Sequence, residues 1–128
     1  MPIAIVRYHR KLEAKEDFFA ELEFLAMRLP AIIAEALNTS HPDGQLMPAD
    51  INVRFERSGP FDQNVIDLSI LILANDYPER RANIKERKEA IVGEVRQMPL
   101  ADNADFSVWI LLAEGAYGAD IFSSPIVK

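Results

Sequence analysis

The second residue of the chain, Pro2, is the residue with the clearest chemical potential. Removal of the initiator methionine would leave Pro2 with a free secondary amine on a rigid ring. A free α-amino group has a pKa of roughly 7.7–8.0, and burial or nearby cations lower that pKa because both disfavour the ammonium form. The neutral amine could then act as a general base on carbon next to a carbonyl group. If Met1 stays attached, the Pro2 nitrogen is an amide, and the residue only caps a strand.

Candidate cations for a carboxylate occur at two places in the chain. Asn52 and Arg54 stand two residues apart in an alternating stretch, so they share one strand face. Arg54 could clamp a carboxylate with two hydrogen bonds, or it could form a structural ion pair with Glu56 on the same face or with a neighbouring subunit. Arg80 and Arg81 follow a turn, where they are either substrate-binding residues or the solvated start of a helix.

Two aromatic residues complete the set of candidate substrate-binding residues. Tyr117 lies in the glycine-flanked turn 115–118 and could wall an apolar pocket that keeps the proline amine neutral. It could equally pack at a boundary between subunits. Trp109 shares a face of the last predicted strand with Leu111, which indicates a core or an interface.

Length and composition predict a single domain over residues 1–128, since the chain is 49% hydrophobic and 27% charged. The net charge of −6 argues against a nucleic-acid partner, because proteins that bind nucleic acids usually carry a net positive charge or a basic surface. The absence of Cys excludes disulfides and thiol catalysis, and two distant histidines do not predict a metal site. No apolar stretch is long enough to span a membrane, and the cytoplasm is the expected location.

The first half of the chain predicts a strand, a long helical region and a second strand. Residues 2–8 are rich in Ile and Val, and apolar residues recur at helical spacing from Glu13 onwards. Pro30 interrupts this region and predicts a kink or two separate helices. Residues 51–57 alternate between apolar and polar side chains, as in a strand with one face buried.

The second half predicts the same order of elements. Residues 65–73 are almost continuously apolar, which predicts a central strand buried on both faces. A helix should start near Pro78, and residues 106–112 should form the last strand. The apolar stripe of that helix consists of Ile84, Ile91, Val95 and Met98.

This order predicts an α/β (α+β) fold in which two β-α-β units form one four-stranded mixed sheet. Each unit should contribute a parallel pair of strands, and the helices should cover one face. The opposite face would be bare and apolar, so oligomerisation is expected to cover it.

Several stretches resemble the tautomerase superfamily, the proteins with an N-terminal proline that include 4-oxalocrotonate tautomerase, 5-carboxymethyl-2-hydroxymuconate isomerase and macrophage migration inhibitory factor (MIF). The start at residues 2–4, the helical stretch 86–95 and the turn 115–118 resemble the first of these enzymes. Residues 29–33 and 51–54 are more similar to the hydroxymuconate isomerase, whose length also fits.

The resemblance implies a homotrimer with an active site at each subunit boundary and with Pro2 as the base. It also implies arginines that bind the carboxylate of a small-molecule substrate, and it requires no cofactor. The substrate arginine of the isomerase falls on Asn52, with Arg54 two residues later. The family's usual Gly-Arg-Ser or Gly-Arg-Thr before the second helix is missing, so Arg80 or Arg81 would have to replace its arginine.

The sequence therefore favours a cofactor-independent keto–enol tautomerase with Pro2 as general base, acting on a small carboxylate-bearing substrate. One alternative is a non-enzymatic trimeric protein that kept the fold and lost the arginines. A second is a small-ligand binding module with ferredoxin-like topology, which would not need a free Pro2 amine.

Overall fold

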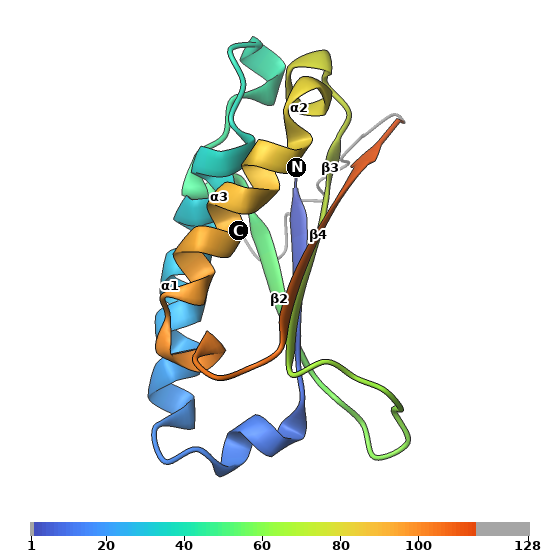
Figure 1. Ribbon diagram of the computed structural model, residues 1–128. Coiled ribbons are helices and arrows are strands. Elements are labelled where there is room, and N and C mark those ends of the chain that lie inside the picture. Colours follow the sequence, from blue (N-terminus) through green and yellow to red (C-terminus); the bar gives the residue numbers. More distant parts are fainter. Residues whose placement is uncertain (1, 115–128) are drawn as a thin grey trace, which may run out of the picture.

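The computed structural model describes residues 2–114 and consists of one sheet with helices packed against one face (Figure 1). Strand order is β2-β1-β3-β4. β1 pairs in parallel with β2, β3 pairs in parallel with β4, and β1 and β3 join the two pairs in antiparallel orientation. The predicted mixed sheet of two β-α-β units is thus confirmed. The strands are β1 (Ile3–Tyr8), β2 (Asn52–Arg57), β3 (Leu68–Asn75) and β4 (Phe106–Ala113).

The helical layer contains two long helices that lie side by side on the same face of the sheet (Figure 1). They are α1 (Phe18–Leu37) and α3 (Ile84–Arg96), and the short α2 (Pro78–Ala82) precedes α3. Short 3₁₀ helices occupy the connections at Arg10–Ala14, Pro42–Gly44, Pro48–Asp50 and Pro99–Ala101. No helix within residues 2–114 combines the length and the apolar character needed to cross a membrane.

Alternation along the strands separates a helix-covered face from a face that we call the open face. On the covered side, Ala4, Val6 and Ile72 are fully buried beneath the helices. On the open face, Ile5 is aligned with Leu71 of β3. The expectation of a third strand buried on both faces is corrected, because residues along β3 alternate between buried and half-buried.

The helix α1 runs unbroken through Pro30, so the expectation of two separate helices is wrong. A proline inside a helix costs about 3 kcal/mol, because it removes one hydrogen bond and crowds the carbonyl four residues earlier. Leu25, Leu29 and Ile33 lie on both sides of it and are fully buried. Burial of each such side chain is worth about 1.5–3 kcal/mol, so the stripe outweighs the cost of Pro30.

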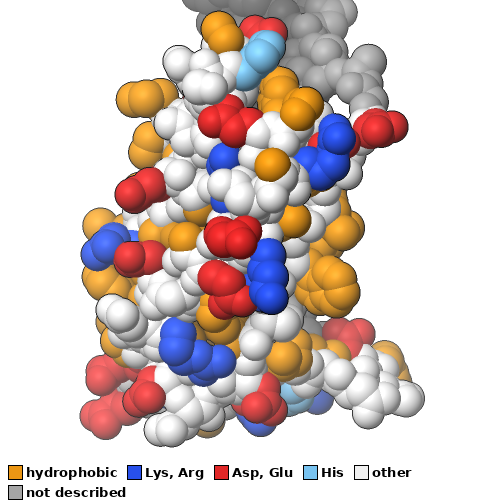
Figure 2. Space-filling view, turned by 45° about the horizontal axis from the view of Figure 1, so that its top comes forward, with side chains coloured by type: hydrophobic (Ala, Val, Ile, Leu, Met, Phe, Trp, Pro, Cys, Tyr) orange, Lys and Arg blue, Asp and Glu red, His pale blue; other side chains and the backbone are white. Residues whose placement is uncertain are grey.

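Charged side chains of both signs lie next to one another on the surface shown in Figure 2. On α3, Lys88 is paired with the neighbouring Glu89 at 3.1 Å. Lys85 is exposed. Arg87 is not merely a surface charge, because its guanidinium donates to the carbonyl oxygens of Ala36 and Asn38 at the end of α1.

Candidate active site

Pro2 is buried at the start of β1, where the first β-α-β unit meets the second. Its carbonyl oxygen accepts a hydrogen bond from the backbone N–H of Asn52 at 3.0 Å. On the other side, Ile3 is aligned with Leu73, so continuing the antiparallel register sets Pro2 opposite Ala74. Ala74 is 4% exposed and belongs to the helix-covered face. Pro2 therefore lies at one end of the sheet, between β2 and β3.

Asn52 and Arg54 are exposed on β2, where they share the open face. Arg54 is aligned with Ile5 of β1, and that row continues through Leu71 to Trp109 at the far edge of the sheet. Within residues 2–114, the side chain of Arg54 makes no hydrogen bond and no ion pair. Its positive charge is therefore available to a ligand on this face.

The ion pair considered between Arg54 and Glu56 does not form. Glu56 pairs instead with Arg7, which lies beside it on β1, at 3.3 Å between the guanidinium Nε and the carboxylate. Parallel pairing of β1 and β2 brings these two side chains together, whereas Arg54 has the apolar Ile5 as its neighbour. This arrangement leaves the predicted substrate cation without a competing carboxylate on its own strand.

Arg80 occupies an entirely different environment, because its side chain is buried and only 2% exposed. Its Nε donates to the carbonyl oxygen of Leu37 at 2.8 Å, Nη1 to that of Asn75 at 3.0 Å, and Nη2 to that of Gly44 at 3.2 Å. Its guanidinium carbon also lies 4.9 Å from the centre of the Tyr77 ring. Burial lowers the pKa of Arg80 from its ordinary value. The side chain presents no surface to a ligand in this conformation.

The next residue, Arg81, is exposed and binds Asp76 at 3.0 Å. Its hydrogen bond to Asp76 raises the pKa of Arg81 above the ordinary value. The structure thus separates the two neighbouring arginines: Arg80 joins three backbone segments, and Arg81 forms a surface ion pair. Neither is brought to the open face beside Arg54.

The aromatic candidates lie away from Pro2 or outside the described residues. Trp109 is 65% exposed and Leu111 is 46% exposed, both on β4, so they do not form part of the core of a single chain. Trp109 also borders a hollow of about 390 Å³ beside Lys85 and Lys88 of α3. Tyr117 lies outside the described residues.

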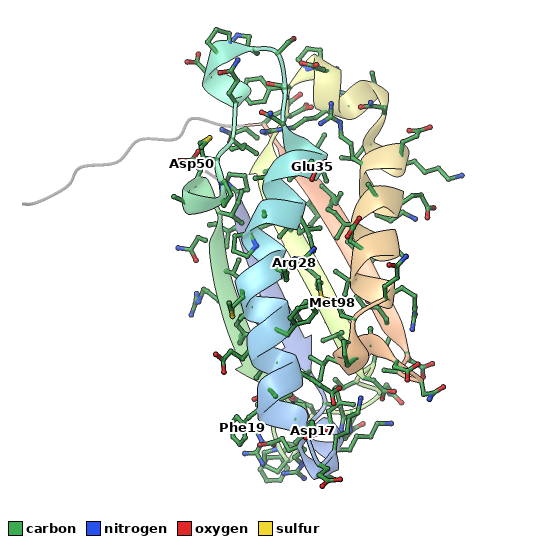
Figure 3. The ribbon with its side chains drawn as sticks, turned by 90° about the vertical axis from the view of Figure 1, so that its left-hand side faces the viewer. Asp17, Phe19, Arg28, Glu35, Asp50 and Met98 are labelled. Carbon is green, nitrogen blue, oxygen red and sulfur yellow. The ribbon has the colours of Figure 1, made fainter. Side chains whose placement is uncertain are left out.

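A groove of about 690 Å³ separates α1 from α3 on the outer helical surface. Arg28 and Glu35, both labelled on α1 in Figure 3, line it together with Glu86 and Glu94 of α3. Pro2 lines neither this groove nor the hollow beside β4. No group of three metal-binding side chains is present in the part of the chain that the structure describes.

Sequence reasoning missed the role of Arg87 and the buried state of Arg80. Both side chains bind carbonyl oxygens at the end of α1, which has no basic residue in its own last turn. Cations near a helix C-terminus are favourable because the last carbonyl groups lack partners. A helix that ends without a basic residue is a weak signal for such partners, and it does not identify them.

Comparison with known proteins finds similarity in structure and none in sequence. No protein-family model matches the chain, and no curated protein sequence matches it. A macrophage migration inhibitory factor-like protein from Entamoeba histolytica has a TM-score of 0.60 at 13% identity, covering 93% of this chain and 95% of that one. Malonate semialdehyde decarboxylase has a TM-score of 0.60 at 10% identity, covering 91% of each chain.

The 5-carboxymethyl-2-hydroxymuconate delta-isomerase has a TM-score of 0.53 at 13% identity, covering 99% of this chain and 91% of that one. All three structures are members of the tautomerase superfamily. The resemblance seen in the sequence is therefore confirmed at the level of the fold. Identities of 10–13% carry no residue roles across.

Proposed function

We propose that the mature protein is a cofactor-independent keto–enol tautomerase that acts on a small carboxylate-bearing substrate. The observation that carries this proposal is the burial of Pro2 at the start of β1 in a chain with this fold. After removal of Met1, a buried secondary amine at that position would favour its neutral, basic form. The likeness in fold to an isomerase and a decarboxylase supports an enzymatic function.

In the proposed reaction, the Pro2 nitrogen accepts a proton from one position of the keto–enol system and returns a proton to another. No atoms are gained or lost, so the reaction requires no cofactor. Arg54 binds the substrate carboxylate through charge-assisted hydrogen bonds, and Asn52 adds a neutral donor on the same face. Both side chains are exposed on β2.

We further propose that three copies of the chain enclose their open faces in a homotrimer. Ile3, Trp109 and Leu111 are all more than a third exposed on this face in a single chain. Apolar surface of this kind marks an association site, and its burial would also lower the dielectric constant around a substrate. We also propose Tyr117 as a substrate-binding residue.

The experiment compares two forms of the protein, one with a free Pro2 amine and one with Met1 retained, each verified by intact mass. The free form should ketonise simple enols such as phenylenolpyruvate, and the blocked form should be inactive because an amide nitrogen is not basic. Arg54→Ala in the free form should weaken substrate binding by about 1.5–3 kcal/mol, roughly a 10- to 150-fold rise in KM. Equal rates for the free and blocked forms would exclude Pro2 as the base.

A non-enzymatic protein of the same fold is the second candidate, and the environment of Arg80 favours it. One of the two arginines that would replace the family's missing Gly-Arg-Ser motif is committed to backbone carbonyl oxygens. In that case neither form would turn over enols, although both would assemble. The ketonisation assay therefore separates the two candidates.

A further inference from the structure

We propose that Arg80 is a positioning residue: from the helix-covered side of the sheet, its positive charge keeps the amine of Pro2 neutral without contacting substrate. This inference rests on the proposed role of Pro2 as a base. It assigns to Arg80 a role other than substrate binding, and it follows from the partners of its guanidinium and from where those partners lie in the sheet.

Arg80 is a buried cation whose hydrogen-bond partners are all neutral. Three of its N–H groups donate to backbone carbonyl oxygens, and no carboxylate lies within ion-pairing distance of it among residues 2–114. Glu79, its neighbour, accepts instead from the backbone and hydroxyl of Ser40. A charge in this state is neither cancelled by a counter-ion nor screened by solvent salt.

The guanidinium of Arg80 lies at the same end of the sheet as Pro2. Its Nη1 binds the carbonyl oxygen of Asn75, the last residue of β3. The antiparallel register sets Pro2 opposite Ala74, the residue just before Asn75. Ala74 belongs to the helix-covered face, and Arg80 also bonds to Leu37 at the end of α1 in that layer. Opposed residues of paired antiparallel strands are about 5 Å apart and consecutive Cα atoms about 3.8 Å apart, so with the 3.0 Å hydrogen bond to Asn75 we infer a separation of roughly 10 Å between the guanidinium and the Pro2 nitrogen.

Other charged groups at this end of the sheet differ in sign and in how far a partner or solvent compensates their charge. Asp76, which follows β3, is neutralised by Arg81 at 3.0 Å. Asp50, labelled in Figure 3 before β2, is half-buried and accepts a hydrogen bond from the backbone N–H of Met47, so it keeps its negative charge. Arg87 of α3 adds a second positive charge at the end of α1.

Three negative groups oppose the effect of Arg80: Asp50, Glu79 and the carbonyl end of α1. The carbonyl end of α1 contributes about half a negative charge and Asp50 one, which together are less than the two full charges of Arg80 and Arg87. Glu79 is exposed, so solvent screens its charge. The net potential at Pro2 is therefore positive, and it disfavours the ammonium form.

The test measures the titration of Pro2 by NMR in Met1-free protein labelled with ¹⁵N-proline. The other seven prolines carry no amine, so a single proline signal should titrate. Arg80→Met should raise the pKa of Pro2 by about one unit, as expected for one charge at about 10 Å in an effective dielectric of about 20. Lys85→Met removes one positive charge from an exposed position on α3 that forms no ion pair among residues 2–114, and it should leave the Pro2 pKa within about 0.3 units.

Arg80→Lys separates charge from backbone bonding, because it keeps the cation but cannot form the same three hydrogen bonds. It should retain the wild-type pKa of Pro2 while lowering the unfolding temperature. A merely structural role would instead shift the pKa equally in Arg80→Lys and Arg80→Met. That outcome would overturn the proposal.

A measurement on the wild type covers the case in which Arg80→Met does not fold. A buried charge is poorly screened, so the Pro2 pKa should stay constant between about 0.05 M and about 0.5 M salt. A rise towards the free-amine value over that range would assign the effect to surface charges and overturn the proposal. Because the readout is a titration, it holds whether or not the protein turns over enols, and a failure of the proposed function is seen separately in the ketonisation assay.

Discussion

Replacing Pro30 by alanine should stabilise the protein, because Pro30 lies in the interior of an unbroken helix. Alanine restores an N–H that can donate to the carbonyl of Ala26, and it removes the clash of the ring with that carbonyl, together worth about 3 kcal/mol. Two opposing terms reduce the gain. Pro30 is half-buried, so loss of its ring carbons costs about 0.8 kcal/mol, and the freer unfolded chain costs about 0.4–1 kcal/mol. The net expectation is a stabilisation of about 1.5 kcal/mol.

The assay is equilibrium unfolding in urea at a fixed protein concentration, with the midpoint compared at unchanged slope. Pro78→Ala is the matched control, since it is the same substitution at the first turn of α2, where proline is favoured. It should destabilise the protein by about 0.4–1 kcal/mol. If Pro30→Ala destabilises the protein by as much as the control does, the account of how α1 tolerates Pro30 is refuted.

Two further predictions concern acid stability and assembly. The carboxylate of Asp67 accepts from Lys11 at 2.7 Å and from the backbone N–H of Asp105, and the hydrogen bond from Lys11 is the main reason that the pKa of Asp67 lies below its ordinary value. The contribution of Asp67 to the free energy of unfolding is therefore present above about pH 4, and it is lost as the pH falls through the lowered pKa. Asp67→Asn should cost about 1 kcal/mol of stability at pH 7. In urea titrations the variant should lose less stability on acidification than the wild type does. A variant that loses stability on acidification as steeply as the wild type would contradict this. For assembly, light scattering at micromolar concentration should give a trimer for the wild type and a smaller species for Trp109→Asp, which places a charge on the open face; a monomeric wild type would contradict the proposed homotrimer.

The sheet could be predicted from the sequence because local patterns determine it. Alternating apolar residues in 51–57 and the β-branched run in β3 identify strands, and the order of strands and helices restricts the pairing to a few topologies. The same local patterns also allowed two separate helices in place of α1, and that alternative is wrong, because Pro30 is a strong local signal for a break but does not end this helix. The helix stays continuous because α1 packs against the sheet. These contacts join residues that are distant in the sequence, so a short stretch of sequence does not reveal them.

The arginines could not be assigned from the sequence because their partners are distant in the chain. Arg80 binds carbonyl oxygens 43 and 36 residues away, and Arg87 binds one 51 residues away. Backbone carbonyls have no sequence signature, so an arginine that binds them looks the same as one that awaits a substrate. Arg54 differs because strand alternation alone places it on the open face.

Pro2 and Arg54 lie apart in a single chain, and for this reason the proposed tautomerase activity depends on the proposed homotrimer. Pro2 is buried at the end of the sheet, whereas Arg54 projects from the open face, where Ile5 and Leu71 form an apolar row beside it. A single chain leaves that row in water, where the charge on Arg54 attracts a carboxylate only weakly. Covering the open face with neighbouring chains would exclude water and strengthen the attraction several-fold. The proposed activity should therefore require the assembled form, and it should fall in the Trp109→Asp variant although Trp109 lies at the opposite edge of the sheet from Arg54.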